Sequence, residues 1–140
     1  MEFRCDQGYA ILVRCMDPRL EESIQEFLIL NGLVGYTYVI SLAGGPKDLA
    51  VEPDGFTANQ IRVACRFHEI RTVFLMSHLD CRAYGGNALY VDAPEAERAL
   101  HLGHLEDARQ HVLALYPGMT VVKLLAVPRE DGTWEIEEIV

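Results

Sequence analysis

Short apolar runs alternate with amphipathic segments along this 140-residue chain, and this alternation constrains the fold more than any other feature. Continuous apolar runs of strand length are typical of strands that are buried on both faces of a parallel sheet. Four such runs occupy residues 9–13, 34–42, 71–77 and 119–127.

Three segments between these runs place apolar side chains three or four positions apart, as an amphipathic helix does. They span residues 18 to about 30, 57–68 and 94–115. Thr57 and Gln60 form a capping-box pattern at the start of the second segment, and Pro117 follows the end of the third. Residues 46–56 have no such periodicity, so we expect a loop there.

The order of these elements predicts an α/β fold. Strands that alternate with helices form right-handed crossovers, which give a mostly parallel central sheet flanked by helices. Asp131-Gly132 is a hairpin signal, and residues 133–139 alternate as an edge strand does. We therefore expect one α/β domain over residues 1–140, with an antiparallel C-terminal edge hairpin.

Composition narrows the classes of partner. Hydrophobic residues make up 50% of the chain and the mean hydropathy is +0.08, which supports a sizeable core. A formal net charge of -9 argues against nucleic acid and against an anionic membrane surface, because both attract clustered Lys and Arg. Small molecules and other proteins remain as partners. The run at residues 9–13 is too short for a signal peptide or a membrane span, so we expect a cytoplasmic protein.

Cysteine and histidine follow the ends of two predicted strands. Cys15 comes after the first strand, and His78 and Cys81 come after the third. Because ligands bind beyond the carboxyl ends of parallel strands, we expect these side chains to meet at one crevice with the glycine-rich turn at 43–45. Thiolate and imidazole together favour zinc, and three protein ligands leave the fourth tetrahedral position for water or a carboxylate, as in catalytic sites.

Simpler interpretations exist for the same residues. The four cysteines include no Cys-x-x-Cys pair and are expected to be ligands or core residues rather than disulfides. Cys15 and Cys81 on their own would be inert buried thiols, Cys65 is expected in the core, and Cys5 receives no role. Asp17 before a proline is also a good helix N-cap, a role that does not exclude one at a metal.

Other polar and glycine positions have structural explanations. Three histidines, His101, His104 and His111, border the apolar face of the last helix without an acidic or thiol partner at ligand spacing, so we expect no second metal site there. Asp80 is expected to be a solvent-facing turn residue. The glycine pairs at 44–45 and 85–86 serve turns first and pocket backbone second.

In chain order these motifs resemble the β-class carbonic anhydrases. Cys-x-Asp-x-Arg, Ala-Gly-Gly, His-x-x-Cys and a late Asp-Gly hairpin follow successive strands, and the match covers nearly the whole chain. The resemblance implies a Zn²⁺ cofactor with ligands Cys15, His78 and Cys81. It also implies a catalytic Asp17–Arg19 pair beside the metal.

The resemblance further implies reversible hydration of CO₂ to bicarbonate by zinc-bound hydroxide. Asp17 would either accept a proton or hydrogen bond from the zinc-bound water, or bind zinc itself as a fourth ligand in a closed site. Arg19 would hold it in the open arrangement through a bidentate ion pair. Two thiolates cancel the charge of Zn²⁺, so activity is expected to favour alkaline pH. Backbone groups of Gly44 and Gly45 would line the substrate pocket.

Two positions depart from the family pattern toward large cations. Arg14 and Arg82 stand where small residues, commonly glycine, are usual, so we expect both to flank the site. The alternatives are therefore a zinc protein that acts on carbonyl sulfide or carbon disulfide, one that binds an anion without hydrating CO₂, and a metal-free interaction domain. The family's N-terminal helical arm is expected to be missing. A homodimer or higher homo-oligomer would then use the sheet edge and helix faces.

Overall fold

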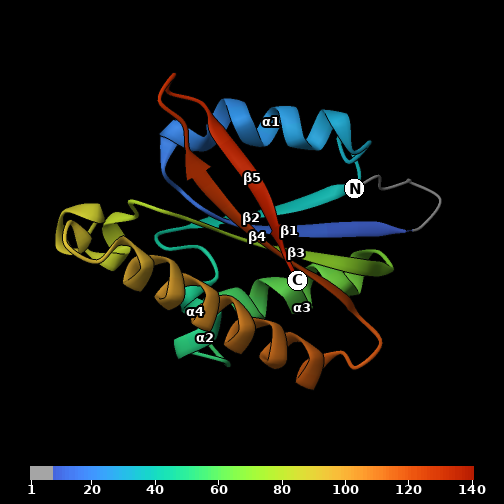
Figure 1. Cartoon of the computed structure of the whole chain (residues 1–140). Helices are drawn as coiled ribbons and strands as arrows, with labels where there is room; N and C mark the ends of the chain where they lie inside the picture. Colours follow the sequence, from blue (N-terminus) through green and yellow to red (C-terminus); the bar gives the residue numbers. More distant parts are fainter. Residues whose placement is uncertain (1–7) are drawn as a thin grey trace.

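A computed structural model describes residues 8–140 and shows a single five-stranded sheet with helices on both faces (Figure 1). The strand order is β2-β1-β3-β4-β5, and every neighbouring pair is parallel except β4–β5. The predicted α/β class and the antiparallel C-terminal edge are therefore confirmed. The strands are β1 (Tyr9–Cys15), β2 (Thr37–Leu42), β3 (Ile70–His78), β4 (Thr120–Pro128) and β5 (Trp134–Ile139).

One helix covers one face of the sheet and three cover the other (Figure 1). The first face carries α1 (Glu21–Leu30), and the second carries α2 (Lys47–Val51), α3 (Phe56–Phe67) and α4 (Pro94–Leu115). Central strands β1 and β3 are buried on both faces, which explains their unbroken apolar sequences. Along β1, for example, Leu12 packs under α1, whereas Ile11 and Val13 belong to the opposite cluster.

The segment predicted as a loop at 46–56 contains the short helix α2, so that prediction is wrong. Leu49 of α2 is fully buried in the second core cluster. The predicted capping box is wrong as well, because α3 begins one residue earlier with Gly55 at its N-cap. Thr57 instead donates its backbone N–H and its hydroxyl to Oδ2 of Asp48, at 3.0 and 2.7 Å. A carboxylate of α2 therefore satisfies the donors at the start of α3.

Other boundaries lie close to those predicted. The helix α4 has the predicted bounds, whereas β2 begins at Thr37 because residues 34–36 form a turn. The Asp-Gly hairpin joins β4 to β5, with Gly132 at a φ of +88°. Among the described residues, three short 3₁₀ helices lie at Pro18–Leu20, Arg82–Tyr84 and Asn87–Tyr90. The first falls at the start of the helix predicted from residue 18, and the other two were not predicted.

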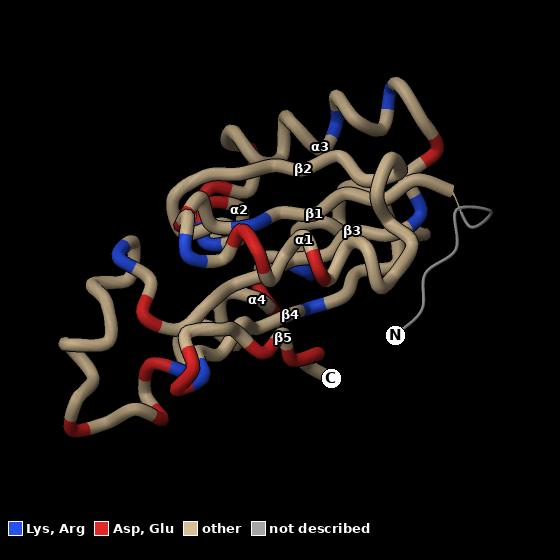
Figure 2. The backbone as a smooth tube through the Cα atoms, turned by 90° about the horizontal axis from the view of Figure 1, so that it is seen from above, with Lys and Arg blue, Asp and Glu red and all other residues tan. Residues whose placement is uncertain are grey.

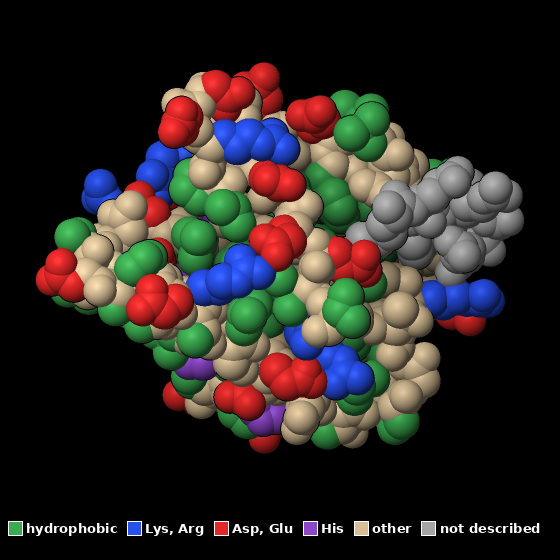
Figure 3. Space-filling model, viewed as in Figure 1, with side chains coloured by type: hydrophobic (Ala, Val, Ile, Leu, Met, Phe, Trp, Pro, Cys, Tyr) green, Lys and Arg blue, Asp and Glu red, His purple; other side chains and the backbone are tan. Residues whose placement is uncertain are grey.

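Charged residues of both signs are interspersed along the chain (Figure 2), and their side chains are interspersed over the face seen in Figure 3. Several form ion pairs, including Arg98 with Glu137 at 2.6 Å and Lys123 with Glu106 at 3.2 Å. Within residues 8–140, no helix is both long enough and apolar enough to cross a membrane.

Candidate metal centre

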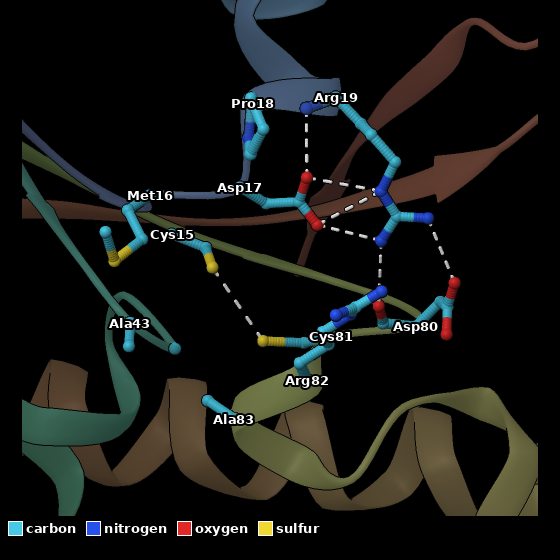
Figure 4. Close-up of a pocket in the computed structure, with 11 residues that line it drawn as sticks. Cys15, Met16, Asp17, Pro18, Arg19, Ala43, Asp80, Cys81, Arg82 and Ala83 are labelled. Carbon is cyan, nitrogen blue, oxygen red and sulfur yellow. Dashed lines mark hydrogen bonds and ion pairs between the residues drawn. The ribbon is translucent and has the colours of Figure 1, made fainter.

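Two thiols and one imidazole meet at the carboxyl ends of β1 and β3. Cys15 is the last residue of β1, His78 is the last residue of β3, and Cys81 follows three residues later. The two sulfur atoms are 3.8 Å apart and point toward one another (Figure 4). The possible ligand atoms of all three buried side chains lie within 4.8 Å of one another. This is the spacing that a single metal ion requires.

The histidine is oriented as a metal ligand is. Its Nδ1–H donates to the backbone oxygen of Leu79 at 2.7 Å, which leaves the Nε2 lone pair facing the two thiols. That Nε2 is buried and has no hydrogen-bond partner within the described residues. Because an unpaired buried acceptor is costly, this atom fits a metal ion, whose ligand histidines are fixed in this way by their other nitrogen. The ring of Trp134 packs edge-on against His78, with centroids 5.4 Å apart.

A shared hydrogen bond shifts the pKa values of the two thiols in opposite directions. The hydrogen bond with Cys81 lowers the pKa of Cys15, and the backbone N–H groups of Asp17 and Gly44 lower it further. The same hydrogen bond raises the pKa of Cys81, and burial and the neighbouring negative charge add to this effect. Two thiolates this close repel each other without a cation between them, so the pair is suited to a divalent metal.

Asp17 caps a short helix and also lies beside the candidate metal position. It caps the 3₁₀ helix by accepting the Arg19 backbone N–H at 2.9 Å, with Pro18 at the first helical position. Its carboxylate also accepts two hydrogen bonds from Nε of Arg19 and one of 2.8 Å from Nη2. These bonds lower the pKa of Asp17 to about 2. Its Oδ2 is 3.8 Å from Nε2 of His78, so a carboxylate lies beside the candidate metal position.

Asp80 is more than the solvent-facing turn residue expected from the sequence. Its Oδ2 accepts a hydrogen bond from Nη1 of Arg19 at 3.0 Å, and its backbone oxygen accepts one from Nη2 at 3.0 Å (Figure 4). Its other carboxylate oxygen accepts the Asn87 N–H, and its own N–H donates to the buried Glu97. The signal in the sequence was only its place between two predicted ligands.

A cavity of about 610 Å³ opens beside these groups, and its walls include Gly44 and Arg82. Gly45 lies outside this lining. A Cβ at Gly45 would lie 2.8 Å from backbone atoms of Arg14 and Cys15, so the absent side chain lets the turn after β2 pack closely against the end of β1. The remaining cavity walls are formed by Cys15, Met16, Asp17, Pro18, Arg19, Ala43, Asp80, Cys81 and Ala83.

Of the two arginines expected to flank the site, only Arg82 lies in the cavity wall. Arg14 is buried and its guanidinium binds the backbone oxygens of Cys15 and Asp17 and the carboxylate of Glu21. Arg14 therefore lies beside the site, inside the protein, and does not line the cavity. A long cation at a strand end can be turned into the interior when backbone oxygens and a carboxylate satisfy its donors.

The three histidines of α4 contact protein groups. Nδ1 of His101 hydrogen-bonds to the Ser77 hydroxyl, that of His104 to the Tyr84 hydroxyl, and that of His111 to a backbone oxygen. In residues 8–140, the Cys15, His78 and Cys81 cluster is the one group of three with metal-binding spacing.

Cys65 is half-buried against the second core cluster, whereas Cys5 lies outside the described residues.

Fold and site together define an α/β protein with a candidate metal centre at the carboxyl edge of its sheet. A family model described as "Putative carbonic anhydrase" matches residues 5–140, and the chain belongs to that family. The expected resemblance to a divergent β-carbonic anhydrase family is thereby confirmed.

A solved structure gives an independent comparison of the fold. The chain resembles the β-carbonic anhydrase isoform I of the protozoan Trichomonas vaginalis, with a TM-score of 0.59 and 18% sequence identity. The match covers 94% of this chain and 81% of that chain. No curated protein matches the sequence.

Proposed function

We propose that this protein is a zinc-dependent lyase that catalyses the reversible hydration of CO₂ to bicarbonate and a proton. One observation carries the proposal: the buried, unpaired Nε2 of His78 lies with two cysteine sulfurs in a group spanning at most 4.8 Å, beside an open cavity. Membership of the carbonic anhydrase family supports the same chemistry.

Three residues would hold the metal, and two would act beside it. Cys15, His78 and Cys81 would supply the ligands. Zinc bound there would lower the pKa of a water molecule and so supply hydroxide as the nucleophile for CO₂. Asp17 lies close enough to accept a hydrogen bond or proton at its Oδ2, and Arg19 orients that carboxylate through its bidentate contact.

The cavity wall would exclude competing water around the substrate. Met16, Pro18, Ala43 and Ala83 contribute apolar surface to it, and Gly44 contributes backbone. Because two thiolates neutralise the charge of Zn²⁺, we expect turnover to rise with pH, in contrast to a zinc held by three neutral imidazoles.

The test measures zinc content and CO₂ hydration on the same purified sample at about pH 7 and about pH 8.5. We expect zinc near one per chain and turnover that rises with pH, and we expect Cys81→Ser to lose both. Cys65→Ser is the matched control, because that thiol lies outside the candidate centre. Absence of zinc in the wild-type protein would contradict the whole proposal, and zinc without turnover would contradict the CO₂ reaction.

A second candidate function follows from Arg82, an exposed cation in the cavity wall. It favours a zinc protein that binds an anion, or one that converts a related small substrate such as carbonyl sulfide or carbon disulfide. On this alternative, Arg82→Gly weakens binding of a small anion to the zinc-loaded protein several-fold, as measured by competition. If Arg82 merely narrows the cavity, the same substitution raises CO₂ turnover and leaves anion binding unchanged.

A further inference from the structure

Arg19 is shared between two carboxylates that come from different parts of the chain. Its Nε and Nη2 bind Asp17, two residues earlier, while Nη1 binds Oδ2 of Asp80 at 3.0 Å. Nη2 also donates to the Asp80 backbone oxygen at 3.0 Å. Figure 4 shows the guanidinium spanning the two residues. The 3₁₀ helix that carries Arg19 is thus tied to the turn that carries Cys81.

Asp80 is itself fixed by contacts that do not involve Arg19. It has a φ of +56°, the one left-handed backbone among the non-glycine residues described. Its N–H donates to Oε2 of the buried Glu97 at 2.8 Å, and its Oδ1 accepts the N–H of Asn87 at 2.8 Å. A residue held at its backbone and at one carboxylate oxygen presents the other oxygen in a defined position.

The position of Arg19 matters because Asp17 lies next to the candidate ligand atoms. Oδ2 of Asp17 is 3.8 Å from Nε2 of His78, and carboxylate oxygen is an ordinary zinc ligand. Asp17 and Arg19 lie on the same short helix and its cap, so their mutual pairing alone does not fix them relative to β3. About half of the Arg19 side chain is exposed, and Asp80 supplies its tie to the metal-binding turn.

We propose that Asp80 is a positioning residue that anchors Arg19 and thereby keeps the Asp17 carboxylate out of the fourth metal position. The inference rests on the proposed function, because it requires a metal at Cys15, His78 and Cys81. Loss of the Asp80 anchor lets the Asp17–Arg19 pair shift as a unit, and Asp17 then competes with external ligands for the metal. The guanidinium of Arg19 also lies over the ring of Trp134, with its carbon 5.3 Å from the ring centroid.

Two substitutions remove the carboxylate that pairs with Arg19, leaving the contact with the Asp80 backbone oxygen, and neither forbids the backbone conformation. Asp80→Asn is nearly isosteric, and asparagine tolerates a left-handed φ better than most residues do. Asp80→Gly removes the side chain and accepts the same φ, so it replaces the first variant if that one loads metal poorly. Glu137→Gln is the matched control, because it breaks another arginine–carboxylate pair, with Arg98, outside the cavity wall.

The experiment measures azide binding to the Co²⁺-loaded protein. Binding is monitored through the change in the visible d–d absorption of the metal. We expect the apparent azide dissociation constant to increase on the order of 3- to 10-fold in Asp80→Asn, and to be unchanged in Glu137→Gln. In an Asp17→Asn background the effect of Asp80→Asn must vanish, because the competing carboxylate is gone. A purely structural defect would persist in that background.

The outcomes separate this inference from the proposed function. Unchanged azide binding in both Asp80 variants overturns the inference, as does an effect that persists with Asp17→Asn. Tighter azide binding in the Asp80 variants also overturns it. That result would mean that the negative charge of Asp80 only repels the azide anion from a distance. A wild-type protein that binds Co²⁺ without a thiolate charge-transfer band overturns the proposed function itself.

Discussion

At the residue scale, Arg14 acts as an internal brace for the loop that carries the candidate metal centre. Only 5% of the residue is exposed. Its Nε donates to the Cys15 backbone oxygen at 2.8 Å, Nη2 donates to the Asp17 oxygen at 3.1 Å, and Nη1 donates to Glu21 at 2.6 Å. These three bonds fix the backbone on either side of Met16, and with it the directions of the Cys15 thiol and the Asp17 carboxylate.

Replacement of Arg14 by methionine should therefore weaken both stability and metal binding. The apolar stem is retained, but two backbone oxygens lose their donor, which costs about 2–4 kcal/mol of unfolding free energy. Urea unfolding measures that loss, and competition with a chromogenic chelator measures the zinc affinity, which we expect to fall several-fold.

Glu21→Gln is the control for the Arg14 prediction. The side chain of Glu21 is 60% exposed and the variant leaves both backbone contacts of Arg14 in place, so smaller changes are expected. If Arg14→Met lowers stability but binds zinc as the wild type does, Arg14 supports the fold without positioning the ligands.

At the scale of the elements, sequence patterns predicted the strands and helices in which buried residues recur many times at a regular spacing. β1 and β3 were recognisable because both of their faces are buried, and α4 because Leu105, Ala108 and Val112 recur on one face at helical spacing. The five-residue helix α2 is too short for a stripe, and it depends on the burial of Leu49. The cap of α3 comes from Asp48, nine positions before Thr57, which no local capping pattern reveals.

In the candidate site too, some features were predictable from the sequence and others were not. Strand ends placed Cys15, His78 and Cys81 correctly at one edge, because the topology of a parallel sheet brings successive carboxyl ends together. The environment of Asp80 was not predictable, since its Arg19 partner is 61 positions away and its Glu97 partner 17. Long polar side chains find such partners only in the folded chain, and the buried contacts of Arg14 were not predictable for the same reason.

The contact between α4 and β3 predicts a dependence of stability on pH. His101 of α4 is fully buried, hydrogen-bonds to Ser77 of β3, and stacks on Tyr84 with centroids 3.9 Å apart. Burial, followed by the nearby His78 and His104, lowers the pKa of His101 from 6.5 to about 4, while the charge of Cys15 opposes this. Between these values the unfolded chain binds more protons, so stability is full above about pH 6.5 and falls as the pH approaches about 4.

The expected loss attributable to His101 is on the order of 3 kcal/mol across that interval. Urea unfolding at several pH values measures it, and His101→Gln should flatten the slope although it lowers the stability at neutral pH. The half-exposed His104 provides the control, because His104→Gln should retain most of the slope. Parallel slopes for wild type and His101→Gln would show that other groups carry the acid sensitivity.

At the scale of the whole molecule, the candidate centre joins segments that are distant in sequence. Cys15 and Cys81 are 66 positions apart, and they come together where β1 ends and just beyond the end of β3. A metal that binds this arrangement in the folded state, and binds the unfolded thiols more weakly, stabilises the fold by mass action. Metal bound at this centre would therefore couple the stability of the domain to metal occupancy.

Removal of the metal with a strong chelator should lower the thermal unfolding midpoint. With free zinc at about 100 times the dissociation constant, the coupling amounts to about 2.7 kcal/mol, which corresponds to a shift of roughly 5–10 °C for a domain of this size. Differential scanning calorimetry on zinc-loaded and chelated samples measures the shift. Cys81→Ser should abolish it and Cys65→Ser should leave it intact, because only the first variant removes a candidate ligand. A chelator effect of equal size in Cys81→Ser would place the stabilising metal elsewhere. If Cys81→Ser instead loses both the chelator effect and the absorption band of the Co²⁺ form, one centre accounts for the stability and for the absorption.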